Sequence, residues 1–203
     1  MKLSLTNRKL LISTHNQGKF DEISILFRPF SCLLVSAKEL GLNEPEEIGC
    51  TFLENAKIKA HAGALASGFP TLADDSGLEV EALGGAPGVY TADWAETPSG
   101  RDFTKAMEEV HKQLEIKKVP HPRLARFTCT LVLAFPNGVE NFYVGSVEGK
   151  VVWPMRGNQG HGYDPIFVPK GHTETFGEMN RWEKNKISHR AKAMEKFFES
   201  NFS

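Results

Sequence analysis

The order of apolar runs along the chain constrains its fold most strongly. In the first half, short apolar runs typical of strands alternate with segments whose apolar residues recur at helical spacing. In the second half, a long run rich in apolar and β-branched residues ends in Asn137-Gly138, a strong hairpin signal. Strand–helix alternation followed by antiparallel strands predicts an α/β protein with a mixed sheet. The expected strands are residues 9–14, 32–35, 69–73, 78–82, 126–135, 139–152 and 166–168, and the expected helices are residues 18–27, a segment beginning at 51, part of 98–118, and 188–200.

The size and charge of the chain limit its organisation and its partners. Its 203 residues are enough for one large domain with a real core, and no linker divides them, so we expect a single domain over residues 1–203. The net charge of −1 creates no overall field that would recruit nucleic acid or an anionic membrane. We therefore expect neither as a partner, and any anion must bind at a local basic cluster.

Cysteine usage and the first residues indicate a cytoplasmic protein. The three cysteines, Cys32, Cys50 and Cys129, include no Cys-x-x-Cys pair. This pattern argues against a disulfide framework or a zinc site and fits a reducing compartment. The only early apolar run, residues 10–12, is too short for a signal-peptide core or a membrane span.

The segment from Ala73 to Val89 carries the most chemistry. Asp74 and Asp75 follow a short apolar run that is typical of a buried strand, and glycines and a proline then predict a tightly turned loop. Carboxylates at the C-terminal tip of a strand suit a hard cation or acid–base chemistry. The alternative is a strand cap in which Asp75 and its neighbours bond nearby backbone N–H groups.

The loop between the first strand and the first helix is a candidate phosphate site. Free N–H groups and the positive end of the helix dipole favour anions at such a junction. Thr14 and Asn16 add donors, and Lys19 adds a positive charge. The loop is not a Walker motif, because Ser13 stands where that motif needs its first glycine. An ordinary turn with an exposed lysine is the alternative.

The helix that begins at Thr51 contains a second candidate. Thr51 and Glu54 have the spacing of a capping box, so Glu54 is expected to cap the helix rather than to catalyse. Lys59 lies two turns further along. It either points toward the ends of the strands or lies in solvent, as most helix lysines do.

Two segments of the second half suit recognition of a nucleobase. His161, Gly162, Tyr163 and Asp164 combine a close-approaching backbone, an aromatic face and an acceptor, whereas the alternative is a glycine loop with one packed tyrosine. In the other segment, a helix capped by Ser188 would begin with His189-Arg190. Cations are disfavoured at a helix start, so this placement suggests a compensating ligand; a chance surface position is the alternative. A nucleoside triphosphate with a magnesium ion would use all of these sites.

Six motifs together resemble those of the inosine/xanthosine triphosphate pyrophosphatases, in the same order and over nearly the whole chain. The resemblance implies an elongated, two-lobed α/β fold around a mixed central sheet with flanking helices, usually as a homodimer. It also implies Mg²⁺-dependent hydrolysis of ITP, dITP and XTP to monophosphate and pyrophosphate, which cleanses the nucleotide pool. The motifs are Thr14-x-Asn16-x-x-Lys19, residues 51–60, residues 73–78, residues 84–90, residues 162–167 and Ser188-His189-Arg190.

The resemblance also implies residue roles. Asp75 is the expected general base and, with Glu47, the expected magnesium ligand. Ser76 is a further substrate contact. The expected triphosphate-binding residues are Thr14, His15, Asn16, Gln17, Gly18, Lys19 and Lys59. The expected base-recognition residues are His161, Gly162, Tyr163, Asp164, Lys184, His189 and Arg190.

Two positions depart from the family pattern, and two other functions remain open. His15 stands where glycine is common, and His161 stands where phenylalanine often stacks on the base. One rival function is a nucleotide-binding regulator without turnover, which the intact Glu47, Asp75 and Lys19 argue against. The other is a related pyrophosphatase that acts on ordinary or methylated pyrimidine nucleotides.

Overall fold

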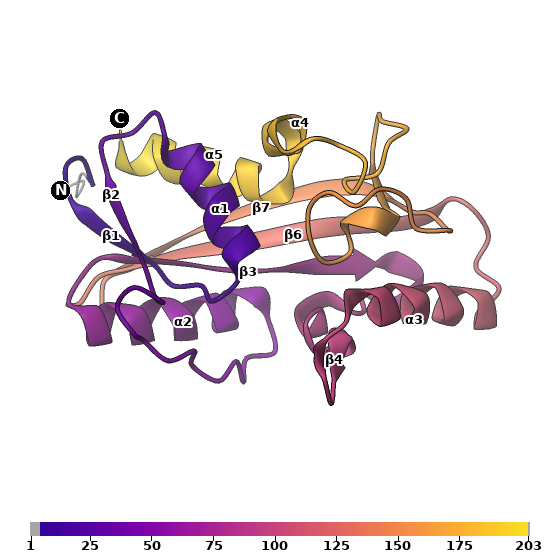
Figure 1. Cartoon of the computed structure of the whole chain (residues 1–203), viewed down its shortest axis with the longest axis horizontal. Helices are drawn as coiled ribbons and strands as arrows, with labels where there is room; N and C mark the ends of the chain where they lie inside the picture. The colour runs from indigo at the N-terminus through magenta and orange to yellow at the C-terminus, as the bar shows by residue number, and fades with distance from the viewer. Residues whose placement is uncertain (1–4, 203) are drawn as a thin grey trace. The chain divides into compact units, whose positions relative to one another are not determined.

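A six-stranded mixed sheet organises the fold, which confirms the α/β class (Figure 1). The computed structural model describes residues 5–202. The strand order is β2-β1-β3-β6-β7-β8, with β1 parallel to β2 and β3, and β7 antiparallel to β8. Its strands are β1 Lys9–Ile12, β2 Leu33–Ser36, β3 Thr71–Val80, β6 Arg123–Ala134, β7 Glu140–Val151 and β8 Phe167–Pro169, and β4 Glu96–Thr97 pairs separately with β5 Gly100–Arg101.

Five α-helices accompany the strands in the described chain. They are α1 Gln17–Phe27, α2 Phe52–Ser67, α3 Phe103–Ile116, α4 Arg181–Ile187 and α5 His189–Asn201. Short 3₁₀ turns cover Glu81–Leu83, Gly88–Tyr90, Asp93–Ala95 and Asp164–Ile166. Among residues 5–202, no helix combines the length and apolarity that a membrane crossing requires.

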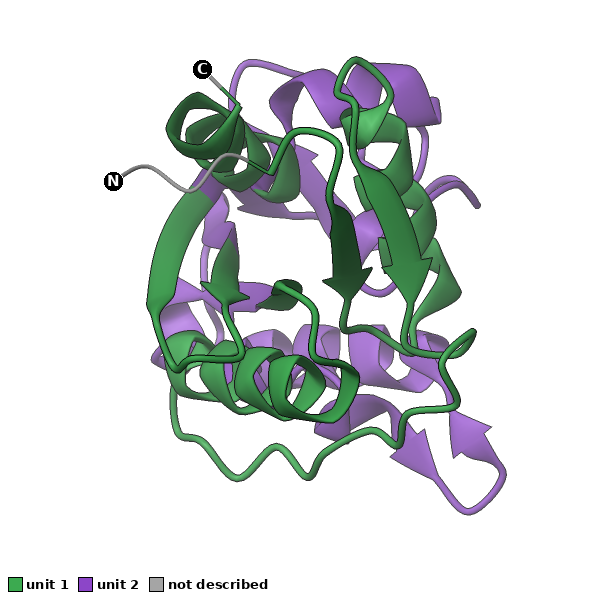
Figure 2. Ribbon diagram, turned by 90° about the vertical axis from the view of Figure 1, so that its left-hand side faces the viewer, with its two compact units in different colours: residues 1–75, 129–145, 190–203 green, residues 76–128, 146–189 purple. Residues whose placement is uncertain are grey.

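The chain divides into two compact units (Figure 2). Unit 1 comprises residues 1–75, 129–145 and 190–203, and unit 2 comprises residues 76–128 and 146–189. Strands β3, β6 and β7 each contribute residues to both units. The assignment of residues 1–203 to one functional domain stays a prediction.

Unit 1 has a core on each face of its part of the sheet. Alternate strand residues point to opposite faces, so Leu72 packs with α1 and α5, whereas the next residue, Ala73, packs with α2 (Figure 1). The contacts of α2 come from Ala56, Ala60 and Ala64, as its small-residue stripe suggests. Small side chains let this helix approach the strands closely, which brings its polar residues near β3.

Unit 2 has a separate core around α3. Met107, Val110 and Leu114 are buried at the helical spacing seen in the sequence. They pack in one cluster with apolar residues of β3 and β6 and with Tyr163 and Phe167. This cluster is the support for the loop before β8.

The structure corrects the sequence-based elements in two places. Strand β3 does not stop at Ala73 but continues through both aspartates to Val80, and every residue of Thr71–Val80 is buried or half-buried. A short helix, α4, precedes the terminal helix and is capped by Asn180, whose side chain accepts the N–H groups of Trp182 and Glu183. Ser188 therefore ends α4 as well as preceding α5, which begins at His189 as expected.

Candidate active site

Side-chain caps shape the loop between β1 and α1. Asn16 caps α1 by accepting the backbone N–H of Lys19 at 3.1 Å. The hydroxyl of Thr14 accepts the N–H of Asn16 at 3.2 Å. The side chain of Gln17 turns along the helix and donates to Asp21. These bonds fix the turn before α1, and the phosphate-binding role of the loop stays a prediction.

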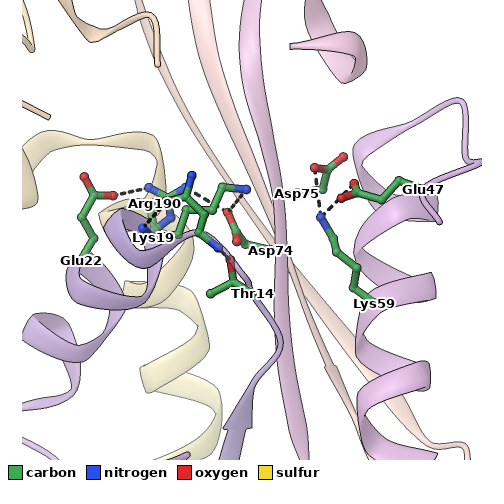
Figure 3. A network of polar contacts seen from close by, with 9 residues as sticks. Thr14, Lys19, Glu22, Glu47, Lys59, Asp74, Asp75 and Arg190 are labelled. Carbon is green, nitrogen blue, oxygen red and sulfur yellow. Dashed lines mark hydrogen bonds and ion pairs between the residues drawn. The ribbon is translucent and has the colours of Figure 1, made fainter. Parts of the chain in front are cut away.

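The adjacent aspartates of β3 face opposite sides of the sheet (Figure 3). Asp74 points toward α1 and α5, where it contacts Lys19 and Arg190. Asp75 points toward α2, where it contacts Lys59. Because β3 continues to Val80, the expectation that the two carboxylates lie at the tip of a strand is wrong. They belong to two separate clusters of charged side chains.

The Asp74 cluster consists of two cations and two carboxylates. The Asp74 carboxylate lies 3.1 Å from Lys19 Nζ and 2.9 Å from Arg190 Nη2, and Arg190 also pairs with Glu22. Although burial opposes it, the charges of Lys19 and Arg190 hold the pKa of Asp74 well below its usual range. Asp74 thus stays ionised and fixes the ammonium of Lys19 near the start of α1.

Arg190 occupies a different setting from the one that its place at a helix start suggested. Its side chain is 1% exposed, and the carboxylates of Asp74 and Glu22 compensate its charge. Burial lowers its pKa, but these carboxylates outweigh that effect and raise the pKa above its ordinary value. No ligand is needed to compensate the charge of Arg190 at the start of the helix. Its role in base recognition stays a prediction, but the unfavourable position of a cation at a helix start no longer supports it.

Lys59 joins the two expected magnesium ligands. Its ammonium lies 2.9 Å from Glu47 Oε2 and 3.3 Å from Asp75 Oδ1, and its side chain is buried, so it does not lie in solvent. Burial lowers the pKa of Lys59, but Asp75 and Glu47 outweigh it and raise the pKa above its ordinary value. The Ser13 hydroxyl also donates to the Lys59 carbonyl, which ties α2 to the end of β1.

Asp75 has the properties of a general base. Burial raises its pKa to about 6, with Glu47 and Asp74 adding to the rise and Lys59 and Lys19 opposing it. A carboxylate with a pKa near neutrality can take a proton at physiological pH. Its Oδ2 atom is buried and has no hydrogen-bond partner among the described residues, so one oxygen remains available to a ligand.

The residues around Lys59 fit a magnesium ion that also binds a nucleotide. Within residues 5–202, no group of three or more His, Cys, Asp or Glu side chains gathers as a metal cage. Mg²⁺ commonly takes only one or two protein carboxylates, with phosphates and water as its other ligands. Glu47 and Asp75 supply such a pair, and the available Oδ2 of Asp75 gives it a coordinating atom.

In unit 2, Asp164 organises the loop predicted to read a base. Its Oδ2 atom accepts the ammonium of Lys184 at 2.6 Å and the N–H of His161 at 2.8 Å. A Cβ atom on Gly160 would lie 2.0 Å from the same oxygen, so only glycine fits there. Asp164 is itself buried. It thus shapes the loop around Gly162 and orients Lys184.

Two predicted base-reading side chains are buried in the same unit. The ring of Tyr163 lies edge-on to Phe103 in the core, and its hydroxyl donates to the carbonyl of Thr91. The ring is therefore part of the core, as in the packed-tyrosine alternative, and the role of Tyr163 in base recognition stays a prediction. His189 stacks on Phe127 at 4.8 Å between ring centroids, which fixes the plane of its imidazole.

Sequence reasoning missed three residues of these clusters. Asp74 was visible as the neighbour of Asp75, and strand alternation would have shown that the two face apart. Glu22 follows Phe20 and precedes Ile23, and its burial beside these apolar residues gave no signal of a partner. Phe127 lies within an expected strand, and its contact with His189 gave no signal because it joins positions 62 residues apart.

Comparison with known proteins identifies the family. Residues 10–200 match the Ham1 family. A dITP/XTP pyrophosphatase of Ruegeria pomeroyi is 59% identical over 193 residues and covers 95% of both chains. One of Agrobacterium fabrum is 51% identical over 207 residues and covers 97% of both.

Solved structures agree with this assignment. A HAM1 protein from Coxiella burnetii superposes with a TM-score of 0.84 at 35% identity, covering 93% of this chain and 95% of its own. The Staphylococcus aureus Ham1 protein gives a TM-score of 0.80 at 31% identity, with the same coverage. The resemblance inferred from the six motifs is confirmed, and this chain belongs to the Ham1 family.

Proposed function

We propose that this chain hydrolyses the deaminated purine nucleoside triphosphates ITP, dITP and XTP to the monophosphate and pyrophosphate. Its relatives at 50–59% identity are named dITP/XTP pyrophosphatases. The observation in the structure that carries the proposal is the Glu47–Lys59–Asp75 cluster, in which Lys59 and Asp75 are buried and one oxygen of Asp75 remains available. A buried polar atom without a hydrogen-bond partner calls for an explanation, and a bound metal ion or nucleotide would supply one.

Unit 1 supplies the groups that suit a triphosphate and its metal. Lys19 and Lys59 offset phosphate charge, and the N–H groups at the start of α1 bind oxygen atoms. Glu47 and Asp75 would hold Mg²⁺, which when bound supplies further charge stabilisation to the phosphates. Because Lys59 now lies between these carboxylates, we expect it to turn toward a phosphate when the nucleotide binds.

Asp75 is the proposed catalytic residue. In its ionised form it takes a proton from a water molecule as that water attacks the α-phosphorus. The bond from the α-phosphorus to the bridging oxygen breaks, and pyrophosphate leaves. The pKa of about 6 leaves most of the Asp75 population ionised at neutral pH while retaining more basicity than an ordinary aspartate has.

Unit 2 supplies the groups that suit the base. Lys184, oriented by Asp164, and His189, oriented by Phe127, carry donors that suit the 6-oxo group of hypoxanthine or xanthine. Adenine has a 6-amino donor at the same position, and two donors facing each other disfavour binding. The contributions of Ser76, His161 and Gly162, a homodimeric assembly and a cytoplasmic location are parts of the proposal that rest on the family resemblance.

A substrate panel tests the function. Wild-type protein with Mg²⁺ should release pyrophosphate from ITP, dITP and XTP far faster than from ATP, GTP or pyrimidine triphosphates, and it should lose this activity when EDTA removes the metal. Binding without turnover would indicate a regulator instead. Preference for pyrimidine nucleotides would indicate the rival enzyme.

A further inference from the structure

The loop that carries Glu47 has little structure of its own. Residues 42–49 have no regular secondary structure, and most of them are exposed. Yet Glu47 Oε2 lies 2.9 Å from Lys59 Nζ, beside Asp75. A long loop places one carboxylate this closely only if contacts elsewhere limit its freedom.

His15 anchors the first end of this loop. Its Nε2 atom lies 2.9 Å from the carbonyl oxygen of Leu42, so the imidazole donates a hydrogen bond across 27 residues of sequence. Both residues belong to unit 1. The bond ties the loop of Glu47 directly to the loop before α1.

Asn55 anchors the other end. It is 3% exposed on the first turn of α2, and its Oδ1 atom accepts the N–H of Gly49 at 2.7 Å. A Cβ atom on Gly49 would lie 2.6 Å from that oxygen, so the contact requires glycine. Thr51 and Glu54 cap the same turn, so the backbone that carries Asn55 is fixed.

We propose that His15 and Asn55 are positioning residues that hold the loop at Leu42 and Gly49 and thereby place Glu47 against Lys59 and Asp75. Their bonds bracket the segment that contains Glu47, which lies two residues from Gly49. The proposal rests on the proposed function, in which Glu47 is a magnesium ligand. It also gives the unusual histidine at position 15 a role other than phosphate binding.

Hydrogen exchange of the metal-free protein tests the two anchors without a measurement of enzymatic activity. The amide of Leu42, which donates to the carbonyl of Ala37, should exchange faster in His15→Ala. The amide of residue 49, which donates to Asn55, should exchange faster in both Asn55→Ala and Gly49→Ala, which break one bond from its two sides. His15→Gln keeps a donor and should restore slow exchange. Glu46→Ala changes an exposed neighbour of Glu47 and should leave exchange as in the wild type. Unchanged exchange in the three anchor variants would overturn the proposal.

Magnesium dependence then tests the positioning. A neutral hydrogen bond changes an equilibrium by a factor of about 2 to 10. We expect the Mg²⁺ concentration for half-maximal ITP hydrolysis to rise by about this factor in His15→Ala and Asn55→Ala, with kcat at saturating Mg²⁺ little changed. In a Glu47→Ala background the anchor variants should add nothing.

The outcomes separate the two proposals. Faster exchange with unchanged magnesium dependence would overturn the positioning role while leaving the proposed function intact. A further rise in the Glu47→Ala background would also overturn it, because the anchors would then act through another group. If the wild-type protein releases no pyrophosphate, the proposed function fails, and the exchange measurements still decide whether the two anchors hold the loop.

Discussion

At the scale of single residues, Asp75 is the most informative position. Asp75→Asn should remove nearly all turnover, because an amide cannot accept the proton and is a poorer magnesium ligand. The fold should remain, since the two side chains have the same shape. Steady-state kinetics with ITP and a thermal unfolding curve check this together. Wild-type kcat with an unchanged thermal midpoint would reduce Asp75 to a structural residue.

The pKa of Asp75 also predicts a pH dependence of stability. Because the folded-state pKa of about 6 lies above the ordinary value of 3.8, folding favours the protonated form. The associated stability is fully present below about pH 4 and is lost as the pH rises through 6. Urea unfolding of metal-free protein should show wild type losing up to about 3 kcal/mol relative to Asp75→Asn between pH 4 and pH 7. A difference that stays constant with pH would contradict this.

Arg190 should matter for stability before it matters for selectivity. Arg190→Ala leaves Asp74 and Glu22 buried without their shared cation, which should cost about 3–5 kcal/mol of unfolding free energy. Arg126→Ala is the control, because Arg126 pairs with Glu79 at the surface and its loss should cost at most about 1 kcal/mol. Equal effects of the two substitutions would show that burial of the Arg190 cluster is not what makes it important. A stable Arg190→Lys protein with a narrowed preference for ITP over ATP would support the base-reading role predicted from sequence.

At the scale of elements, the loss of Glu54 and the loss of Glu47, both near the start of α2, should have different effects on stability and activity. Glu54 accepts the N–H groups of Cys50 and Thr51 and completes the predicted capping box, so Glu54→Ala should cost about 0.5–2 kcal/mol of stability and little activity. Glu47→Ala should do the reverse. Chemical denaturation and kinetics of both variants check the pair, and the opposite pattern would mean that the cap and the metal ligand have been exchanged.

The close approach of α2 to the sheet gives a second prediction. Helix propensity alone says that Gly63→Ala should stabilise α2 by about 1 kcal/mol. A Cβ atom there would lie 2.8 Å from Thr71 Cγ2 and 3.1 Å from Leu11 Cδ2, so overpacking should instead cost about 1–3 kcal/mol. Ala66→Gly, at an exposed position of the same helix, should cost about 0.5–1 kcal/mol from propensity alone. Stabilisation by Gly63→Ala would show that the helix can move away from the strands.

Sequence patterns predicted the elements where the local signal was strong. The capping box at Thr51, the stripe of α3 and the Asn-Gly turn reflect interactions between near neighbours, and the structure confirms them. The end of β3 was wrong because polar residues at 74 and 75 look like a terminus, whereas distant cations from α1, α2 and α5 allow them inside the strand. Helix α4 was missed because it is short and lacks a clear apolar stripe.

The clusters of the candidate site show the same limit. The family resemblance named Lys19, Glu47, Lys59 and Asp75, and the structure joins the last three in one network and connects Lys19 to Asp74 instead. The partners that set these positions lie far apart in sequence, and no local pattern encodes them. Asp164 and Lys184 were both named for base contacts, but only the structure shows that they bind each other.

At the scale of the whole molecule, the two units divide the proposed work. Unit 1 contains the phosphate loop, the Asp75 cluster and the Asp74 cluster, and unit 2 contains the loop organised by Asp164. Strands β3, β6 and β7 contribute residues to both units. This division predicts that Lys184→Ala changes the ratio of ITP to ATP hydrolysis, whereas Lys59→Ala lowers both alike. Kinetics of the two variants with both substrates check it, and identical changes would contradict it.

The most direct test of the account is the position of the oxygen that water contributes. ITP hydrolysed in ¹⁸O-labelled water with Mg²⁺ should give IMP that carries one ¹⁸O atom and pyrophosphate that carries none, as mass spectrometry of both products would show. This result follows if Asp75 activates water for attack at the α-phosphorus. Label in the pyrophosphate, or release of labelled orthophosphate in its place, would contradict the proposed reaction.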